Sequence, residues 1–276
     1  MVGEVFENLL LQLLFTVGLI AAFGLVIWLL NRVFYKLAGD YGKVACILTG
    51  FIGTPVHEAG HAIFCVLFGH KVVEMKLYQP NSKDGVLGYV SHTYNKKNVY
   101  HQIGNFFIGL GPIILGSGVL LLLMFLLVPD LLGELSDTMN LLALLNLDLF
   151  SFSTIGYIFE ILWEIVTTFF GTASLTDPLW WLFMIPACSI ALHMSLSASD
   201  IKGSAIGFIF IVSALLITNI ILYFVNIDAM WAMTDWSLRI SGFILNFLMI
   251  SILLSLILVF IAGVFKGASK LIKLKK

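Results

Sequence analysis

The sequence predicts an all-α polytopic membrane protein with one short β-hairpin in a polar loop. Of its 276 residues, 60% are hydrophobic and only 11% are charged, and the mean hydropathy is +1.03. Soluble domains are typically about 45–50% apolar and about 25% charged. The remaining evidence is a series of apolar runs long enough to cross a bilayer.

Six apolar runs approach or exceed the length of about 20 residues that a helix needs to cross the hydrocarbon core. We therefore expect about six transmembrane helices. The first run has no basic segment before it and no small-residue cleavage site after it, so we expect a spanning helix rather than a signal peptide. The runs cover residues 9–31, 44–69, 102–128, 178–198, 204–225 and 240–265.

The charges between these runs predict a topology. With a cytosolic N-terminus, eleven lysines fall on the inside and four basic residues on the outside. Because basic loops are retained in the cytosol, we expect both termini there, most simply in the cell membrane. The acidic segment 129–177 contains no Lys or Arg, and we expect it to be interfacial or re-entrant. A single crossing there would reverse the side of everything after it.

One polar segment, residues 71–97, is long enough to be non-helical. In its first part Val73, Met75 and Leu77 alternate with polar residues, which is the period of a β-strand. Turn-forming residues follow at 79–85, and a second β-prone run extends to Tyr94. The pattern predicts a β-hairpin over residues 71–94.

A short motif in the second run, His57-Glu58-Ala59-Gly60-His61, carries the chemistry. On a helix the two histidines lie one turn apart on one face, where both imidazoles can hold one zinc ion. Glu58 projects beside them and can act as a general base in metal-assisted hydrolysis. Coincidence is the alternative explanation, but three ionisable groups are costly in an apolar run and usually mark a site. We therefore expect one Zn²⁺ per chain.

A catalytic zinc ion needs a third protein ligand and one open position. A third histidine six residues after His61 would complete a continuous motif, but Leu67 occupies that position. Asp200 is the preferred candidate, because it lies in a polar break between two apolar runs, towards the expected membrane face of His61. His193, seven residues earlier, is the alternative third ligand. Further candidates are His70, His92 and His101.

Other residues have simpler interpretations. Cys46, Cys65 and Cys188 lie in apolar runs without a C-x-x-C pair, so we expect buried small hydrophobes rather than disulfides or a thiolate zinc site. The net charge of -1 offers no basic surface for a nucleic-acid partner. Small residues in the third run favour close helix packing, with Asn105 bonding to a neighbouring helix; the glycines are Gly104, Gly109, Gly111, Gly116 and Gly118.

Three motifs in this order resemble the site-2 protease family of intramembrane zinc metalloproteases. They are the His57 to His61 motif, Gly109-Leu110-Gly111-Pro112 and Asp200-Ile201-Lys202-Gly203. The resemblance implies zinc held by His57, His61 and Asp200, with Glu58 as general base. It also implies cleavage within or next to a transmembrane segment of a membrane-protein substrate in the lipid bilayer. The family's late motif usually has an Asn and a nearby Pro-rich run, whereas here the Asn is missing and Pro186 is distant.

The resemblance extends to the organisation of the chain. It implies a metalloprotease core at 44–225, between a first helix and loop at 1–43 and a last helix and basic cytosolic tail at 226–276. The hairpin would correspond to the family's membrane-associated β element. An edge strand can hold an unwound substrate segment through main-chain hydrogen bonds, which makes Val73, Met75 and Leu77 candidate substrate-binding residues.

Two other functions remain open at this stage. The first is a non-proteolytic membrane zinc protein that acts as a scaffold or chaperone, although a structural zinc site has no need for Glu58. The second is a membrane zinc protease that uses a late glutamate as its third ligand, for which Glu160 or Glu164 would serve. The sequence does not define an oligomeric state.

Overall fold

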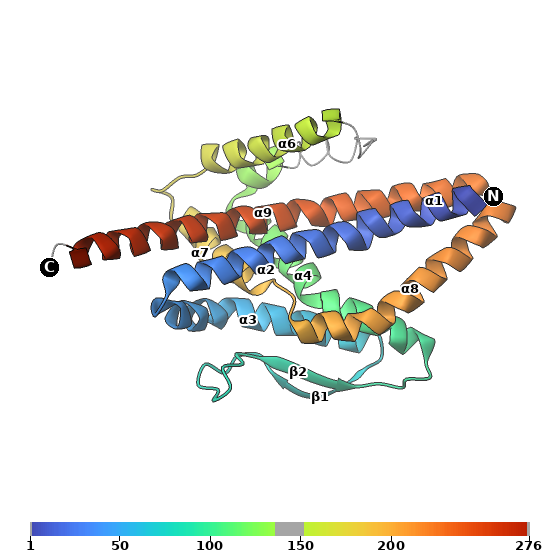
Figure 1. Ribbon diagram of the computed structural model, residues 1–276, viewed down its shortest axis with the longest axis horizontal. Coiled ribbons are helices and arrows are strands. Elements are labelled where there is room, and N and C mark those ends of the chain that lie inside the picture. Colours follow the sequence, from blue (N-terminus) through green and yellow to red (C-terminus); the bar gives the residue numbers. More distant parts are fainter. Residues whose placement is uncertain (1, 136–151, 275–276) are drawn as a thin grey trace.

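The computed structural model describes residues 2–135 and 152–274, which form helices and one two-stranded antiparallel sheet (Figure 1). The first helical segment contains a short π-helical turn at Leu14–Gly18. The elements are α1 (Val2–Leu13), α2 (Leu19–Ala38), α3 (Tyr41–Leu67), β1 (Lys71–Lys76), β2 (Tyr89–Thr93), α4 (Val99–Leu127), α6 (Phe152–Gly171), α7 (Pro178–His193), α8 (Ala198–Val225) and α9 (Ile227–Leu274).

Four helical segments among the described residues are long and apolar enough to cross a membrane, so the chain is a multi-pass membrane protein by this criterion. They are Gly3–Ala38, Val99–Leu127, Ala198–Val225 and Ile227–Ser269. Two predicted runs lie outside this group. The helix α7 has only 16 residues and is too short. The helix α3 carries His57, Glu58 and His61, which lower its hydropathy.

The first and last long helical segments pack side by side in parallel. Near the start of each segment, Thr234 donates a hydrogen bond to Asn8 over 2.5 Å. Further along, Ser255 donates to Asn31 over 3.3 Å. Because residue numbers rise together along both segments, the N- and C-terminal ends lie at opposite ends of the pair (Figure 1). The expectation that both termini lie on the same side is therefore wrong for this arrangement.

The helices α7 and α8 explain the discrepancy. Asn31 donates to the carbonyl of Leu192 at the end of α7 over 2.9 Å, whereas Asn219 of α8 donates to Gln12 over 2.9 Å. From Leu192 to Asn219 the chain therefore moves from the level of Asn31 back to that of Gln12. In Figure 1, α7 leads towards the start of α8, and α8 continues away from it. The predicted spans 178–198 and 204–225 do not form an up-and-down pair, which removes one expected reversal of the chain.

Glycines allow three helices to approach closely around the His57 to His61 motif. A Cβ atom on Gly60 of α3 would lie 2.5 Å from the carbonyl oxygen of Gly111 on α4. A Cβ atom on Gly109 would collide with Ser204 of α8. The predicted packing role is confirmed at these α4 positions and also at Gly104 and Gly116.

The packing prediction fails at two other positions of α4. A Cβ atom on Gly118 would meet nothing within 4 Å, so no neighbour requires a glycine there. The amide of Asn105 donates to Gln102 within the same helix over 3.4 Å and not to a neighbouring helix.

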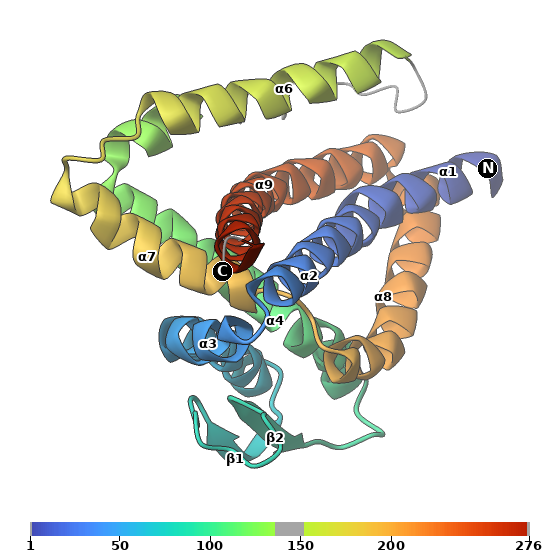
Figure 2. The same ribbon diagram turned by 60° about the vertical axis from the view of Figure 1, so that its left-hand side comes forward.

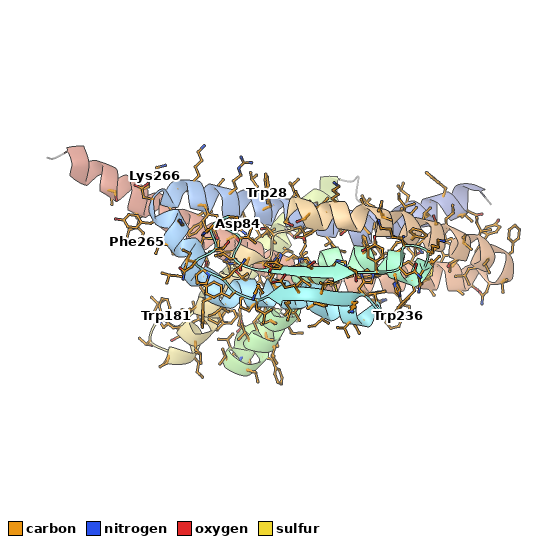
Figure 3. The ribbon with its side chains drawn as sticks, turned by 90° about the horizontal axis from the view of Figure 1, so that it is seen from below. Trp28, Asp84, Trp181, Trp236, Phe265 and Lys266 are labelled. Carbon is orange, nitrogen blue, oxygen red and sulfur yellow. The ribbon has the colours of Figure 1, made fainter. Side chains whose placement is uncertain are left out.

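The predicted hairpin is confirmed. Its register runs from Lys71 opposite Thr93 to Lys76 opposite Tyr89, with an irregularity between Val72 and Glu74. The hairpin lies along α3 on the side away from α9 (Figure 2), and in the view from below its strands lie in front of the helices (Figure 3). The second strand begins at Tyr89, so residues 86–88 belong to the loop.

Candidate metal centre

His57 and His61 of α3 meet Asp200, which lies in the first turn of α8. The two histidine Nε2 atoms are 3.3 Å apart. The Nε2 atom of His61 lies 3.3 Å from one carboxylate oxygen of Asp200, and that of His57 lies 3.9 Å from the other. Ligands about 2.0–2.1 Å from a tetrahedral zinc ion are separated by about 3.3 Å. The three side chains therefore fit one zinc ion.

Backbone carbonyls fix the orientation of both imidazole rings. The Nδ1 atom of His57 lies 2.7 Å from the carbonyl oxygen of His193, and the Nδ1 atom of His61 lies 2.7 Å from that of Ile108. A carbonyl oxygen only accepts hydrogen bonds, so each Nδ1 carries a proton and donates it. The Nε2 lone pairs then face each other and the Asp200 carboxylate, which is the arrangement that metal-ligating histidines adopt.

The start of α8 holds the carboxylate of Asp200 in place. The backbone N–H of Ser197 donates to Asp200 over 2.7 Å, and the Ser197 hydroxyl accepts from the backbone N–H of Asp200 over 3.2 Å. This reciprocal capping box fixes the first turn of the helix. The side chain of Asp200 is only 12% exposed, so its charge faces the histidines with limited screening by water.

Glu58 is buried and lines the same cavity as the three candidate ligands. The cavity has a volume of about 420 Å³. Its other walls come from α4, from the start of α8 and from the hairpin. A carboxylate is thus present beside the ligand group, as hydrolysis by a general base requires.

The hairpin contributes different residues to the cavity from those that the sequence suggested. Val73, Met75 and Leu77 are exposed and do not line it. The hairpin residues that do line it are Val86, Gly88, Tyr89, Val90 and His92. The alternation of apolar residues identified a strand correctly, but it did not show which of the two strands lines the cavity.

Gly88, at the end of the hairpin loop, lies directly over Glu58. A Cβ atom on Gly88 would come within 2.8 Å of Glu58 Cγ and within 2.7 Å of Thr54 Cγ2. Gly88 also lines a second cavity of about 250 Å³, together with His57, Glu58 and His193. The sequence analysis did not predict this contact. The one local signal for it is Gly88 itself, a glycine immediately before β2.

His193 supports the ligand group rather than joining it. Its carbonyl oxygen holds His57, and its own Nδ1 atom donates to the carbonyl of Ser189 over 2.9 Å. Its Nε2 atom is buried and has no hydrogen-bond partner among the described residues. Among the groups that the structure describes, Asp200 and not His193 shares the ligand cluster with His57 and His61.

The other candidate ligands lie elsewhere. Glu160 and Glu164 are exposed on α6, which lies on the side of the molecule opposite the hairpin (Figure 2). His70 and His92 form a separate group with Cys65. His101, on α4, accepts a hydrogen bond from His70 through its carbonyl oxygen.

Comparison of the chain with protein-family models, curated proteins and solved structures finds no match. Function is therefore inferred from the residues of the candidate centre and from their geometry.

Proposed function

We propose that the chain is a zinc-dependent endopeptidase that hydrolyses peptide bonds within or next to a transmembrane segment of membrane-protein substrates. The observation that carries this proposal is the convergence of two histidine lone pairs and the Asp200 carboxylate. Three acceptors that face one another repel, and a divalent cation among them relieves the repulsion. Glu58 in the same cavity favours a catalytic over a purely structural zinc ion.

Each side chain then has a defined role. His57, His61 and Asp200 hold one Zn²⁺, and the carbonyls of His193 and Ile108 orient the two imidazoles. Zinc, when bound, supplies a Lewis acid that polarises the scissile carbonyl and makes water nucleophilic at neutral pH. Glu58 takes a proton from the attacking water and then delivers it to the leaving amine.

The surroundings of the centre indicate how a substrate is presented. A helical peptide bond is shielded by its own backbone hydrogen bonds, so the substrate must unwind locally. The strand β2 supplies Tyr89 and Val90 to the cavity wall. We place the extended substrate segment against this wall and no longer against Val73, Met75 and Leu77. In this proposal α3 crosses the membrane, which is most simply the cell membrane, and carries Glu58 to the depth of the substrate helix.

The experiment compares cells that produce the wild-type protein, the Glu58→Gln variant or the Glu164→Gln variant. Terminal-peptide mass spectrometry maps the cut sites in all membrane proteins. We expect fragments that end within or next to transmembrane segments in the wild type and in Glu164→Gln, because Glu164 is exposed on α6. We expect none in Glu58→Gln. The same fragments in Glu58→Gln would contradict the proposal. If Glu58→Gln fully restored the phenotype of cells that lack the protein, a scaffold or chaperone function would be favoured.

A further inference from the structure

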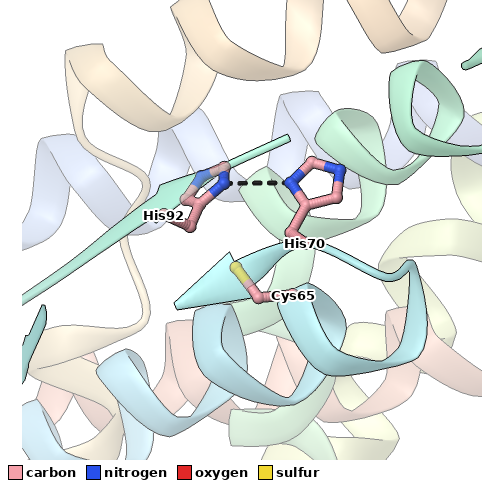
Figure 4. Close-up of side chains that lie close together, drawn as sticks. All are labelled: Cys65, His70 and His92. Carbon is pink, nitrogen blue, oxygen red and sulfur yellow. Dashed lines mark hydrogen bonds between the residues drawn. The ribbon is translucent and has the colours of Figure 1, made fainter. Parts of the chain in front are cut away.

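A second group of ligand-type side chains lies where α3 meets the hairpin (Figure 4). Cys65 is in the last turn of α3, His70 directly precedes β1, and His92 is on β2. Their ligand atoms all lie within 4.8 Å of one another, and the two Nδ1 atoms of the histidines are 2.9 Å apart. Cys65 and His70 are buried, and His92 is half-buried.

The backbone brings these residues together by a specific turn. Gly69 has a φ angle of +70°, which side-chain-bearing residues rarely adopt. This turn returns the chain onto the end of α3, and the N–H of His70 donates to the carbonyl of Cys65 over 2.8 Å. The sheet register then places Val72 opposite His92, so that His92 faces the same end of α3.

His70 is held in the tautomer that suits a metal ligand. Its Nε2 atom lies 2.9 Å from the carbonyl oxygen of His101. The Nε2 atom therefore carries the proton, and the Nδ1 lone pair points towards His92 and Cys65. The same carbonyl-to-imidazole arrangement orients His57 and His61 in the first centre.

An aromatic ring covers His70. The ring of Tyr94 stacks on His70, with centroids 4.6 Å apart. Burial lowers the pKa of His70 and also lowers the pKa of His92. A neutral imidazole is the form that binds a metal ion.

We propose that Cys65, His70 and His92 form a second zinc site, which fixes the hairpin to α3. A thiolate and two imidazoles are a ligand set that zinc prefers. On binding, the Cys65 thiol releases its proton to solvent, and no redox step is involved. The chain then holds two zinc ions instead of the one that the sequence predicted. Because His92 also lines the large cavity, the second ion would hold the cavity wall in position. The proposal does not depend on the proposed proteolysis.

Cobalt substitution tests this site, because only a cysteine ligand gives a sulfur-to-cobalt charge-transfer band in the near ultraviolet. The first centre contains no sulfur ligand. The full-length protein is purified in detergent, stripped of metal and titrated with Co²⁺. We expect the band in the wild type and in Cys188→Ser, and its loss in Cys65→Ser. The band should persist in Asp200→Asn, where the first centre is disrupted.

Zinc content provides the second readout. We expect two zinc ions per chain in the wild type and one in Cys65→Ser. If Cys65→Ser does not fold, His92→Gln on the half-buried strand provides the same comparison, with one zinc ion expected. A wild-type protein without a sulfur-to-cobalt band would overturn the proposal, and so would a band that survives in Cys65→Ser. A pair of histidines joined only by a hydrogen bond predicts the first of these results, together with no loss of zinc in Cys65→Ser.

Discussion

The two groups of candidate metal ligands meet α3 one helical turn apart, at His61 and at Cys65, yet their surroundings differ. In the group of His57, His61 and Asp200, the buried carboxylate of Glu58 lines the adjoining cavity. In the group of Cys65, His70 and His92, the ring of Tyr94 stacks on a ligand, and among the described residues no carboxylate belongs to the cluster. Both groups use a backbone carbonyl to orient an imidazole. In our proposals the group beside the Glu58 carboxylate serves catalysis, and the group that ties α3 to the hairpin serves structure.

The largest expected effect comes from Asp200, the carboxylate ligand that the second group lacks. Asp200→Ala removes a carboxylate that faces both histidines, so we expect loss of one zinc ion per chain and of all cleavage. Metal analysis of purified protein checks the zinc content. Glu164→Ala is the control and should keep both ions, since Glu164 is exposed on α6. The reverse pattern, with zinc lost only in Glu164→Ala, would show that a late glutamate is the ligand.

A smaller effect is expected from the second group. His92→Gln should remove one zinc ion and weaken the attachment of β2 to α3, while His57, His61 and Asp200 keep theirs. We expect faster hydrogen exchange in residues 86–93 and a reduction of cleavage of about tenfold, in the lower part of the range seen when supporting residues of metal sites are lost. Hydrogen-exchange mass spectrometry checks the first effect. Unchanged exchange together with unchanged zinc content would remove the proposed difference between the groups.

The smallest effect is expected at the loop that covers the first group. In Gly88→Ala the new Cβ atom would lie within 2.8 Å of Glu58 Cγ, so the loop must shift. We expect both zinc ions to remain and cleavage to fall a few-fold, measured as an initial rate. Gly118→Ala is the matched control, because a Cβ atom there meets nothing within 4 Å. An equal loss in both variants would show that the contact over Glu58 has no specific role.

Sequence periodicity predicted the parts of the molecule that depend on local geometry. The spacing of His57 and His61 places them on one face of any helix, and the alternation around Val73 predicts a strand in any fold. Helix direction is different, because it is set by contacts such as that of Asn31 with Leu192. For this reason the sequence predicted multiple apolar helices correctly but placed the two termini on the same side.

The second group was missed for a similar reason. Cys65 in an apolar run is indistinguishable from a packed hydrophobic residue. Its proximity to His92 depends on the turn at Gly69 and on the register of the hairpin. The irregularity between Val72 and Glu74 changes which side chains share a face. Neither the register nor this irregularity can be obtained from the alternation of residues alone.

The central claim, that Glu58 is the base of a zinc peptidase, is tested most directly on one purified preparation of Glu58→Gln. Zinc content and cleavage of a membrane protein identified by the fragment comparison are measured together. We predict two zinc ions per chain, as in the wild type, and cleavage slower by about 10²–10⁴-fold, the usual contribution of a general base. Cleavage at the wild-type rate with zinc retained would contradict the account.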